Sequence, residues 1–97
     1  MKISEVQTGM MGVRLIARVE EMGAIREVKT KFGTQTRVCE ATISDESGTM
    51  KLTLWAEQID KIKPGDSVEI VNGIAREWQG VKQLSVSEKR GELKVNP

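Results

Sequence analysis

Residues 41–55 read ATISDESGTMKLTLW. The run M-K-L-T-L near the end of this stretch alternates apolar and polar residues, which is typical of a strand with one buried face. The run D-E-S-G before it has Asp first and Gly last, as tight turns prefer. We therefore predict a hairpin whose strands, residues 38–43 and 50–55, meet at a turn over residues 45–48.

The rest of the chain adds further strands and one short helix to this hairpin. Alternation from Val13 onward predicts a long first strand that bends at Gly23 and continues to residue 28, before a turn at residues 31–34. One or two helical turns are predicted at residues 56–62, because the following K-P-G-D run stops a helix. The remaining strands are expected from residue 68 to 78, at residues 81–86 and, as a short closing strand, at residues 93–95.

Five main strands with the helix between the third and the fourth predict an all-β fold, the five-stranded OB-fold barrel. A long, bent first strand suits such a barrel, because it can pair at both ends of the closed sheet. Ala17, Ala41 and Ala75 are small enough for a narrow interior. An open β-sandwich is the structural alternative, and the position of the helix argues against it. The whole chain, residues 1–97, is expected to form this one domain.

Composition narrows the class of protein. The chain has 97 residues, a net charge of +1 and a single cysteine, Cys39. One cysteine cannot form an internal disulfide, and the chain opens without a charged-then-apolar leader and has no membrane-length apolar run. We expect a soluble, cytoplasmic and nucleoid-associated protein with no membrane partner. Because the net charge is almost zero, any binding of a polyanion must depend on where the charges lie.

The three aromatic residues, Phe32, Trp55 and Trp78, all occur among polar residues. Trp55 shares its strand face with Lys51 rather than with the apolar residues, Trp78 precedes a Gln-Gly turn, and Phe32 lies at the tip of a loop. Flat, exposed rings can stack on the bases of single-stranded nucleic acid. The alternatives stay open: each Trp could be a half-buried surface residue or brace a turn, and Phe32 could pack on the rim of the barrel.

A local basic group surrounds these rings. A bulge at Asn72-Gly73 would reverse the side-chain alternation, so that Ile74, Arg76 and Trp78 face outward together. Phosphate contacts by basic side chains beside stacking rings are typical of single-strand binding. The basic residues expected near the rings are Arg26, Lys29, Lys31, Arg37, Lys51, Arg76 and Lys82.

The sequence gives little support to an enzyme. It contains no histidine, no cysteine pair and no Gly-rich phosphate loop before a helix. Asp45 and Glu46 are adjacent, but the predicted turn already explains them. Cys39 alternates into the predicted core. We expect no metal, no cofactor and no small-molecule substrate.

Residues 41–55, together with residues 62–66, 69–73 and 78–84, resemble the OB-fold of archaeal single-stranded DNA-binding proteins. Related domains occur in replication protein A and in the human sensor of single-stranded DNA. The likeness extends over residues 13–86. The resemblance implies that rings at Trp55 and Trp78 stack on bases and that basic residues at Arg26 and near Lys31 touch the strand.

Two features depart from the family pattern. Members commonly carry a further aromatic residue where this chain has Ile74, which can pack on a base but gives less than a stacked ring. Many members also have a long tail that recruits partners, and this sequence stops at Pro97.

The sequence therefore predicts a non-catalytic protein that binds single-stranded DNA, largely independently of sequence, in replication, repair or recombination. Two alternatives stay open: an OB domain that binds proteins of a larger DNA-maintenance assembly, including repair or replication proteins, and an OB domain that binds RNA. The predicted contact residues are Trp55, Trp78, Phe32, Ile74 and the seven basic residues named above.

Overall fold

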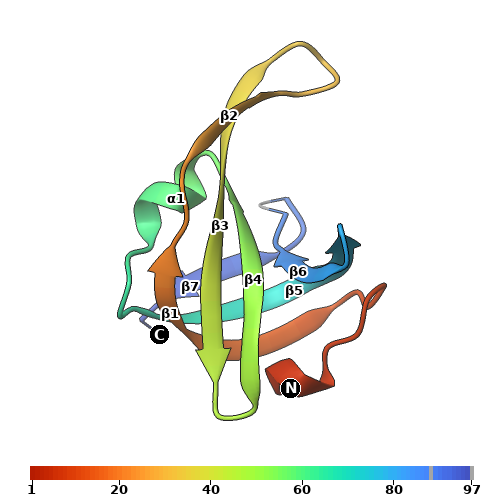
Figure 1. The fold of residues 1–97 in the computed structure, drawn as a ribbon, viewed down its shortest axis with the longest axis vertical. Coiled ribbons are helices and arrows are strands. Elements are labelled where there is room, and N and C mark those ends of the chain that lie inside the picture. Colours follow the sequence, from red (N-terminus) through yellow and green to blue (C-terminus); the bar gives the residue numbers. More distant parts are fainter. Residues whose placement is uncertain (88, 97) are drawn as a thin grey trace.

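The computed structural model describes residues 1–87 and 89–96, and five of its strands form a closed ring (Figure 1). They are β1 (Val13–Met22), β3 (Gln35–Asp45), β4 (Gly48–Trp55), β5 (Ser67–Trp78) and β6 (Val81–Ser85). Their order is β1-β3-β4-β6-β5, and pairing between β1 and β5 closes the ring. All pairs in the ring are antiparallel except β4 and β6. This arrangement confirms the predicted five-stranded OB-fold.

Four smaller elements complete the described fold. The helix α1 (Glu57–Lys61) lies between β4 and β5, which correspond to the predicted third and fourth strands. Two strands lie outside the ring: β2 (Arg26–Lys29) pairs with β3, and β7 (Glu92–Val95) pairs with β5. A short 3-10 helix, η1 (Ile3–Glu5), begins the chain.

Neither helix in the described part of the chain is long and apolar enough to cross a membrane.

Alternate residues of the ring strands point inward and form the core. Ala17, Ala41 and Ala75 are at most 4% exposed, so the predicted small residues do line the narrow interior. Cys39 is buried as well, and its Sγ donates a hydrogen bond to the carbonyl oxygen of Gly23. The largest fully buried core residues include Ile43, Leu52, Leu54, Ile70 and Leu84.

The predicted first strand is interrupted rather than continuous. β1 ends at Met22 and β2 begins at Arg26, although both pair with β3. At the break, the backbone N–H of Gly23 donates to the carbonyl oxygen of Glu40 at 2.9 Å, and a Cβ on Gly23 would lie 2.6 Å from that oxygen. Only glycine permits this approach. The predicted bend at Gly23 is confirmed, whereas the predicted continuity of the strand through it is wrong.

The predicted bulge at Asn72-Gly73 is confirmed. Val13 pairs with Gly73 and Leu15 pairs with Ile70, so β5 advances three residues while β1 advances two. Asn72 takes the extra position with a φ of 58°. Side-chain alternation reverses there. Gly73 and Ala75 consequently point into the core, and the next outward positions belong to Ile74, Arg76 and Trp78.

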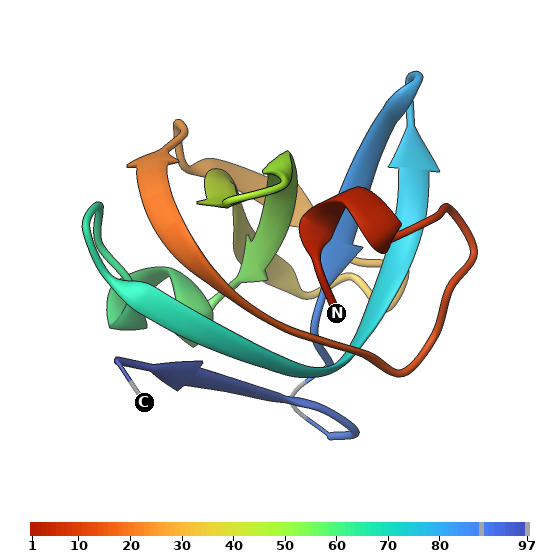
Figure 2. The same cartoon turned by 90° about the horizontal axis from the view of Figure 1, so that it is seen from below.

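The N-terminal segment, for which no structure was predicted, closes one end of the ring. Ile3 and Val6 are 4% and 0% exposed and belong to the core cluster. Figure 2 shows η1 lying across this end. The N–H of Gly9 donates to the carbonyl oxygen of Ala75, and the N–H of Ala75 donates to that of Met10. The start of the chain is thus part of the barrel.

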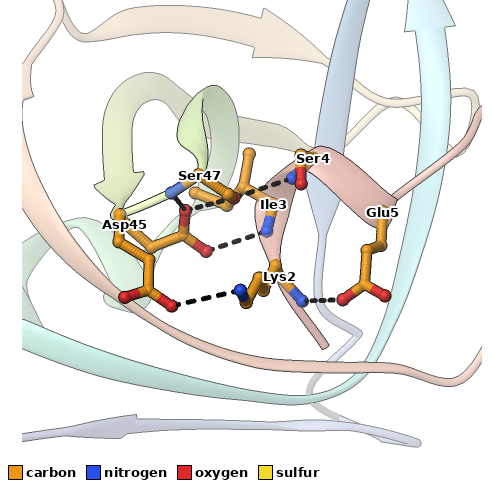
Figure 3. Close-up of polar contacts among 7 residues, drawn as sticks. Lys2, Ile3, Ser4, Glu5, Asp45 and Ser47 are labelled. Atoms are coloured by element: carbon orange, nitrogen blue, oxygen red, sulfur yellow. Dashed lines mark hydrogen bonds and ion pairs between the residues drawn. The ribbon is translucent and has the colours of Figure 1, made fainter.

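Asp45, the last residue of β3, holds η1 in place (Figure 3). Its carboxylate accepts hydrogen bonds from the N–H of Ile3 at 2.8 Å and from the N–H of Ser47 at 2.7 Å. Burial by itself would raise the pKa of Asp45. Hydrogen bonds from the Ser47 hydroxyl and from the backbone of Ile3, Ser47 and Gly48 outweigh burial and lower that pKa below its ordinary value.

We expect Asp45→Ala to lower the free energy of unfolding by about 1–2 kcal/mol near neutral pH, because the donors around the carboxylate lose their acceptor. Since the pKa is lowered in the folded state, this stabilisation is complete above the carboxyl pKa of the unfolded chain, about 4. It is lost as the pH falls through the lower native value. Urea denaturation of the two proteins near neutral pH and at about pH 2 measures both effects.

The control is Glu46→Ala, at the next residue of the chain. The side chain of Glu46 is 77% exposed, and Nζ of Lys2 lies 3.4 Å from its carboxylate. Removal of an exposed ion pair changes stability little. Equal losses in the two variants would show that the Asp45 contacts to η1 contribute nothing of their own.

Candidate nucleic-acid interface

Trp55 and Trp78 line the same hollow on the outer face of the sheet. This hollow has a volume of about 480 Å³, and residues of β2, β3 and β4 form its other walls. Trp55 is 42% exposed and Trp78 is 59% exposed. Val38 lies opposite Trp55 in the β3–β4 register and is 5% exposed, so it adds an apolar part to the floor.

Strand ends place both rings at the margin of this hollow. Trp55 is the last residue of β4, and Ala56, with a φ of 50°, turns the chain away toward α1. Trp78 is the last residue of β5 and pairs with Val81 across a two-residue turn. Both turn residues have positive φ angles, which suits a tight hairpin. The two rings therefore come from strands that are separated in the ring by β6.

Two more hollows continue the first one along the sheet. A hollow of about 420 Å³ shares Arg26, Glu40, Trp78 and Gln83 with the first. A third, of about 510 Å³, shares Lys51 and Val81 with the second and reaches the turn between β3 and β4. We call the first two hollows together the outer groove.

Polar side chains from β2, β3, β4 and β6 form the floor of the outer groove. The Thr53 hydroxyl donates to Oε1 of Gln83 at 3.1 Å. Nε2 of Gln83 donates in turn to Oε1 of Glu40 at 3.3 Å. Nη2 of Arg26 lies 3.7 Å from the same carboxylate oxygen. The floor is a linked row of groups that can meet the edge of a base, between walls that carry tryptophan rings.

Three of the predicted basic residues line the outer groove. Arg26 and Lys29 lie on β2, beside Trp55 and Trp78. Lys51 lies on β4, and its Nζ donates to the Thr42 hydroxyl at 2.8 Å. Two strands, β2 and β4, therefore supply the basic side chains of the outer groove.

Two predicted residues share the face of the outer groove without lining it. Ile74 and Arg76 lie on β5 on the same side as Trp78. They pair with Ser85 and Gln83 of β6 in the register. The reversal of alternation at the bulge thus puts them where the sequence predicted, one strand beyond the floor.

Phe32 and Lys31 lie away from the outer groove. Beyond Gly23, β2 and the first half of β3 form an arm that projects from the ring (Figure 1). Phe32 lies in the loop between these strands and is 83% exposed. Nζ of Lys31 lies 5.4 Å from the centroid of its ring, in a cation–π contact. Neither residue lines any of the three hollows.

Arg37 is not beside the rings, contrary to the prediction. Its neighbour Val38 pairs with Trp55, so alternation turns Arg37 to the opposite face of β3. There its guanidinium donates to Oδ2 of Asp60 in α1 at 2.9 Å. The hydrogen bond from this guanidinium to Asp60, and the charge of that carboxylate, raise the pKa of Arg37.

The side chain of Lys82 also lies away from the rings, contrary to the prediction. Its Nζ donates a hydrogen bond to the carbonyl oxygen of Val6, which ties β6 to the N-terminal segment. The side chain lines the third hollow but not the outer groove. No structure was predicted for residues 1–12, so this contact was not expected from the sequence.

Three residues of the polar floor were not among the predicted contact residues: Glu40, Thr53 and Gln83. Alternation in β3 already turned Val38, Glu40 and Thr42 outward, so the outward position of Glu40 was available from the sequence. The approach of Gln83 to Thr53 and Glu40 was not, because it depends on the parallel pairing of β4 with β6. That pair joins strands separated by α1 and all of β5.

Among the residues that the structure describes, no three His, Cys, Asp or Glu side chains gather in an arrangement that could hold a metal ion.

The chain is similar in sequence to a family of known proteins. Residues 6–95 match the family model described as single-stranded DNA binding protein Ssb-like, OB fold. The chain is 35% identical over 88 residues to the single-stranded DNA binding protein Ssb of Saccharolobus solfataricus, covering 91% of this chain and 59% of that protein. It is 32% identical over 89 residues to replication factor A of Methanothermobacter thermautotrophicus, covering 89% of this chain and 11% of that protein.

A solved structure has the same fold. The second OB-fold domain of replication protein A from Methanococcus maripaludis superposes with a TM-score of 0.79 and 25% identity, covering 98% of this chain and 92% of that one. The chain thus spans nearly all of an isolated OB domain, but less than two thirds of each of the two full-length relatives.

Proposed function

We propose that this chain, which belongs to the OB-fold family of Ssb-like single-stranded DNA-binding proteins, binds single-stranded DNA in its outer groove without catalysis. The observation that carries the proposal is the pair of exposed tryptophans on one groove with Arg26, Lys29 and Lys51. Bases stack on the rings while the basic side chains contact phosphates. Covering exposed strands during replication, repair or recombination follows from such binding.

Stacking accounts for binding that is largely independent of sequence. Every base has a π-face, and stacking on an aromatic side chain contributes about 1–3 kcal/mol per base. The rings of Trp55 and Trp78 are exposed before any ligand arrives, so they need no rearrangement to receive a base. A duplex keeps its bases stacked on each other, and it therefore presents no free face to these rings.

We expect Trp55→Ala and Trp78→Ala each to weaken binding to a thymidine oligonucleotide by roughly ten- to a hundredfold, because each loses about one stacked base. The fold should persist, since neither ring belongs to the core cluster. Fluorescence anisotropy of a labelled oligonucleotide measures affinity, and circular dichroism checks the fold.

Ile16→Ala serves as the matched control for these variants. Ile16 is an exposed apolar residue of β1, 57% exposed, and lines none of the three hollows described above. Its removal should leave the affinity unchanged. Wild-type affinity in both tryptophan variants would place the binding face elsewhere.

Phosphate contacts predict a defined salt dependence. If about three to five basic side chains touch phosphates, log K should fall against log salt with a slope of about −2 to −3.5. Arg26→Ala should make the slope shallower by about 0.7, because its guanidinium lies in the outer groove. Arg37→Ala should leave the slope as it is, because Asp60 holds that side chain on the opposite face. A salt-independent affinity in the wild type would contradict the role of the basic residues.

Titration of the intrinsic tryptophan fluorescence tests the proposed function itself. A thymidine oligonucleotide should quench the emission, a duplex of the same length should not, and added salt should weaken the effect. A uridine oligonucleotide in the same assay separates DNA from RNA, a choice for which the groove contains no assigned 2′-hydroxyl contact. No response to any single strand, together with self-association or a co-purifying protein, would instead favour a protein-binding OB domain.

A further inference from the structure

An acidic side chain lies in the middle of the proposed DNA groove. Glu40 lines both hollows of the outer groove, and the other charged residues that line them are Arg26, Lys29 and Lys51. A carboxylate repels phosphate, so Glu40 opposes the function that the three cations serve. Glu40 lies in the same hollows as Trp55 and Trp78, so its carboxylate is placed to contact the bases of a bound strand rather than the phosphates.

The neighbours of Glu40 fix the direction of its carboxylate. Because Oε1 of Gln83 accepts the Thr53 hydroxyl, Nε2 of Gln83 is turned toward Glu40. Gln83 and Arg26 both approach the same oxygen of Glu40, Oε1. Among the described residues, no hydrogen bond or ion pair engages Oε2 of Glu40. The side chain is 35% exposed, so this oxygen is held in position and can still be reached from the groove.

An ionised carboxylate only accepts hydrogen bonds, which makes it selective among bases. Cytosine, adenine and guanine each carry an exocyclic amino group on the edge used for base pairing. Thymine and uracil carry on that edge a single ring N–H between two carbonyl oxygens, which a carboxylate repels. The pairing of Glu or Asp with the amino group of cytosine is one of the recurrent direct contacts to DNA. Single strands expose these edges.

We infer that Glu40 is a specificity-determining residue, which favours bases with an exocyclic amino group over thymine and uracil. The inference depends on the proposed function, because it assigns a base contact within the same groove. The preference limits the sequence independence of binding. Every base can stack on the tryptophans, but only bases with an amino group also donate a hydrogen bond to the carboxylate. Arg26 and Gln83 act on specificity through Glu40 by holding its Oε1.

The experiment compares oligonucleotides of deoxycytidine and thymidine of equal length. Cytosine carries the amino group where thymine carries a carbonyl oxygen, and thymine also has a ring N–H and a 5-methyl group. The wild type should bind the cytidine strand about three- to tenfold more tightly, as expected for a charge-assisted contact in a partly exposed site. Glu40→Gln should bring the ratio of affinities close to one, mainly through tighter binding of the thymidine strand, because a repulsive charge is removed. The matched control is Glu92→Gln on β7, which removes the same charge outside the groove and should keep the wild-type ratio.

A second measurement needs no protein variant. A cytidine strand whose amino groups are dimethylated keeps its ring but loses the amino donors, and its affinity for the wild type should fall to that of the thymidine strand. Equal affinities for cytidine and thymidine strands, with binding still dependent on Trp55, would overturn the inference and leave the proposed function intact. Failure of the wild type to bind either strand would overturn the proposed function.

A purely structural role for Glu40 predicts a different result. If the residue only held Arg26 and Gln83 in place, Glu40→Gln would change the affinities for both strands by the same factor. An unchanged ratio in this variant, beside a ratio above one in the wild type, would therefore assign the preference to another group.

Discussion

The strand β3 changes its pairing partner partway along its length, and this change shapes both the ring and the outer groove. β3 pairs with β4 on one side along most of its length, but on its other side it pairs first with β2 and then with β1. The switch occurs at Gly23, whose backbone packs directly against the carbonyl oxygen of Glu40. On one side of this contact the sheet closes into a ring, and on the other it projects as an arm. The outer groove lies where the two parts meet.

This junction explains why the groove has both apolar and charged walls. Near the junction the outward side chains of β3 are Val38 and Glu40, an apolar residue beside Trp55 and a carboxylate beside Gln83. β2 contributes Arg26, which lies opposite Val38 in the register and reaches Glu40. A floor that combines these groups can accept the face of a base and its edge at the same time. The ring alone would present only the central part of this surface.

Much of the fold could be predicted from the sequence because a strand has a period of two. Alternation located the core face of β1, β3 and β4, and the bulge at Asn72 was foreseeable from its Asn-Gly pair. The same alternation predicted outward positions for Trp55 and Trp78. It also implied that Arg37, next to the outward Val38, lies on the opposite face, although Arg37 was counted among the basic residues expected around the rings. The contact between Lys82 and Val6, the residue after η1, was unpredictable, because it joins residues 76 positions apart in the chain.

Local backbone preference and alternation between neighbouring residues are enough to specify the class of fold, the positions of the turns and the exposure of the two tryptophans. Which side chains share the groove also depends on contacts between strands that are distant in the chain. Glu40 and Thr53 face each other across the β3–β4 hairpin, but Gln83 joins them only because β4 and β6 pair in parallel. Such a pairing joins segments that are distant in the chain and follows from closure of the ring, so no local pattern encodes it.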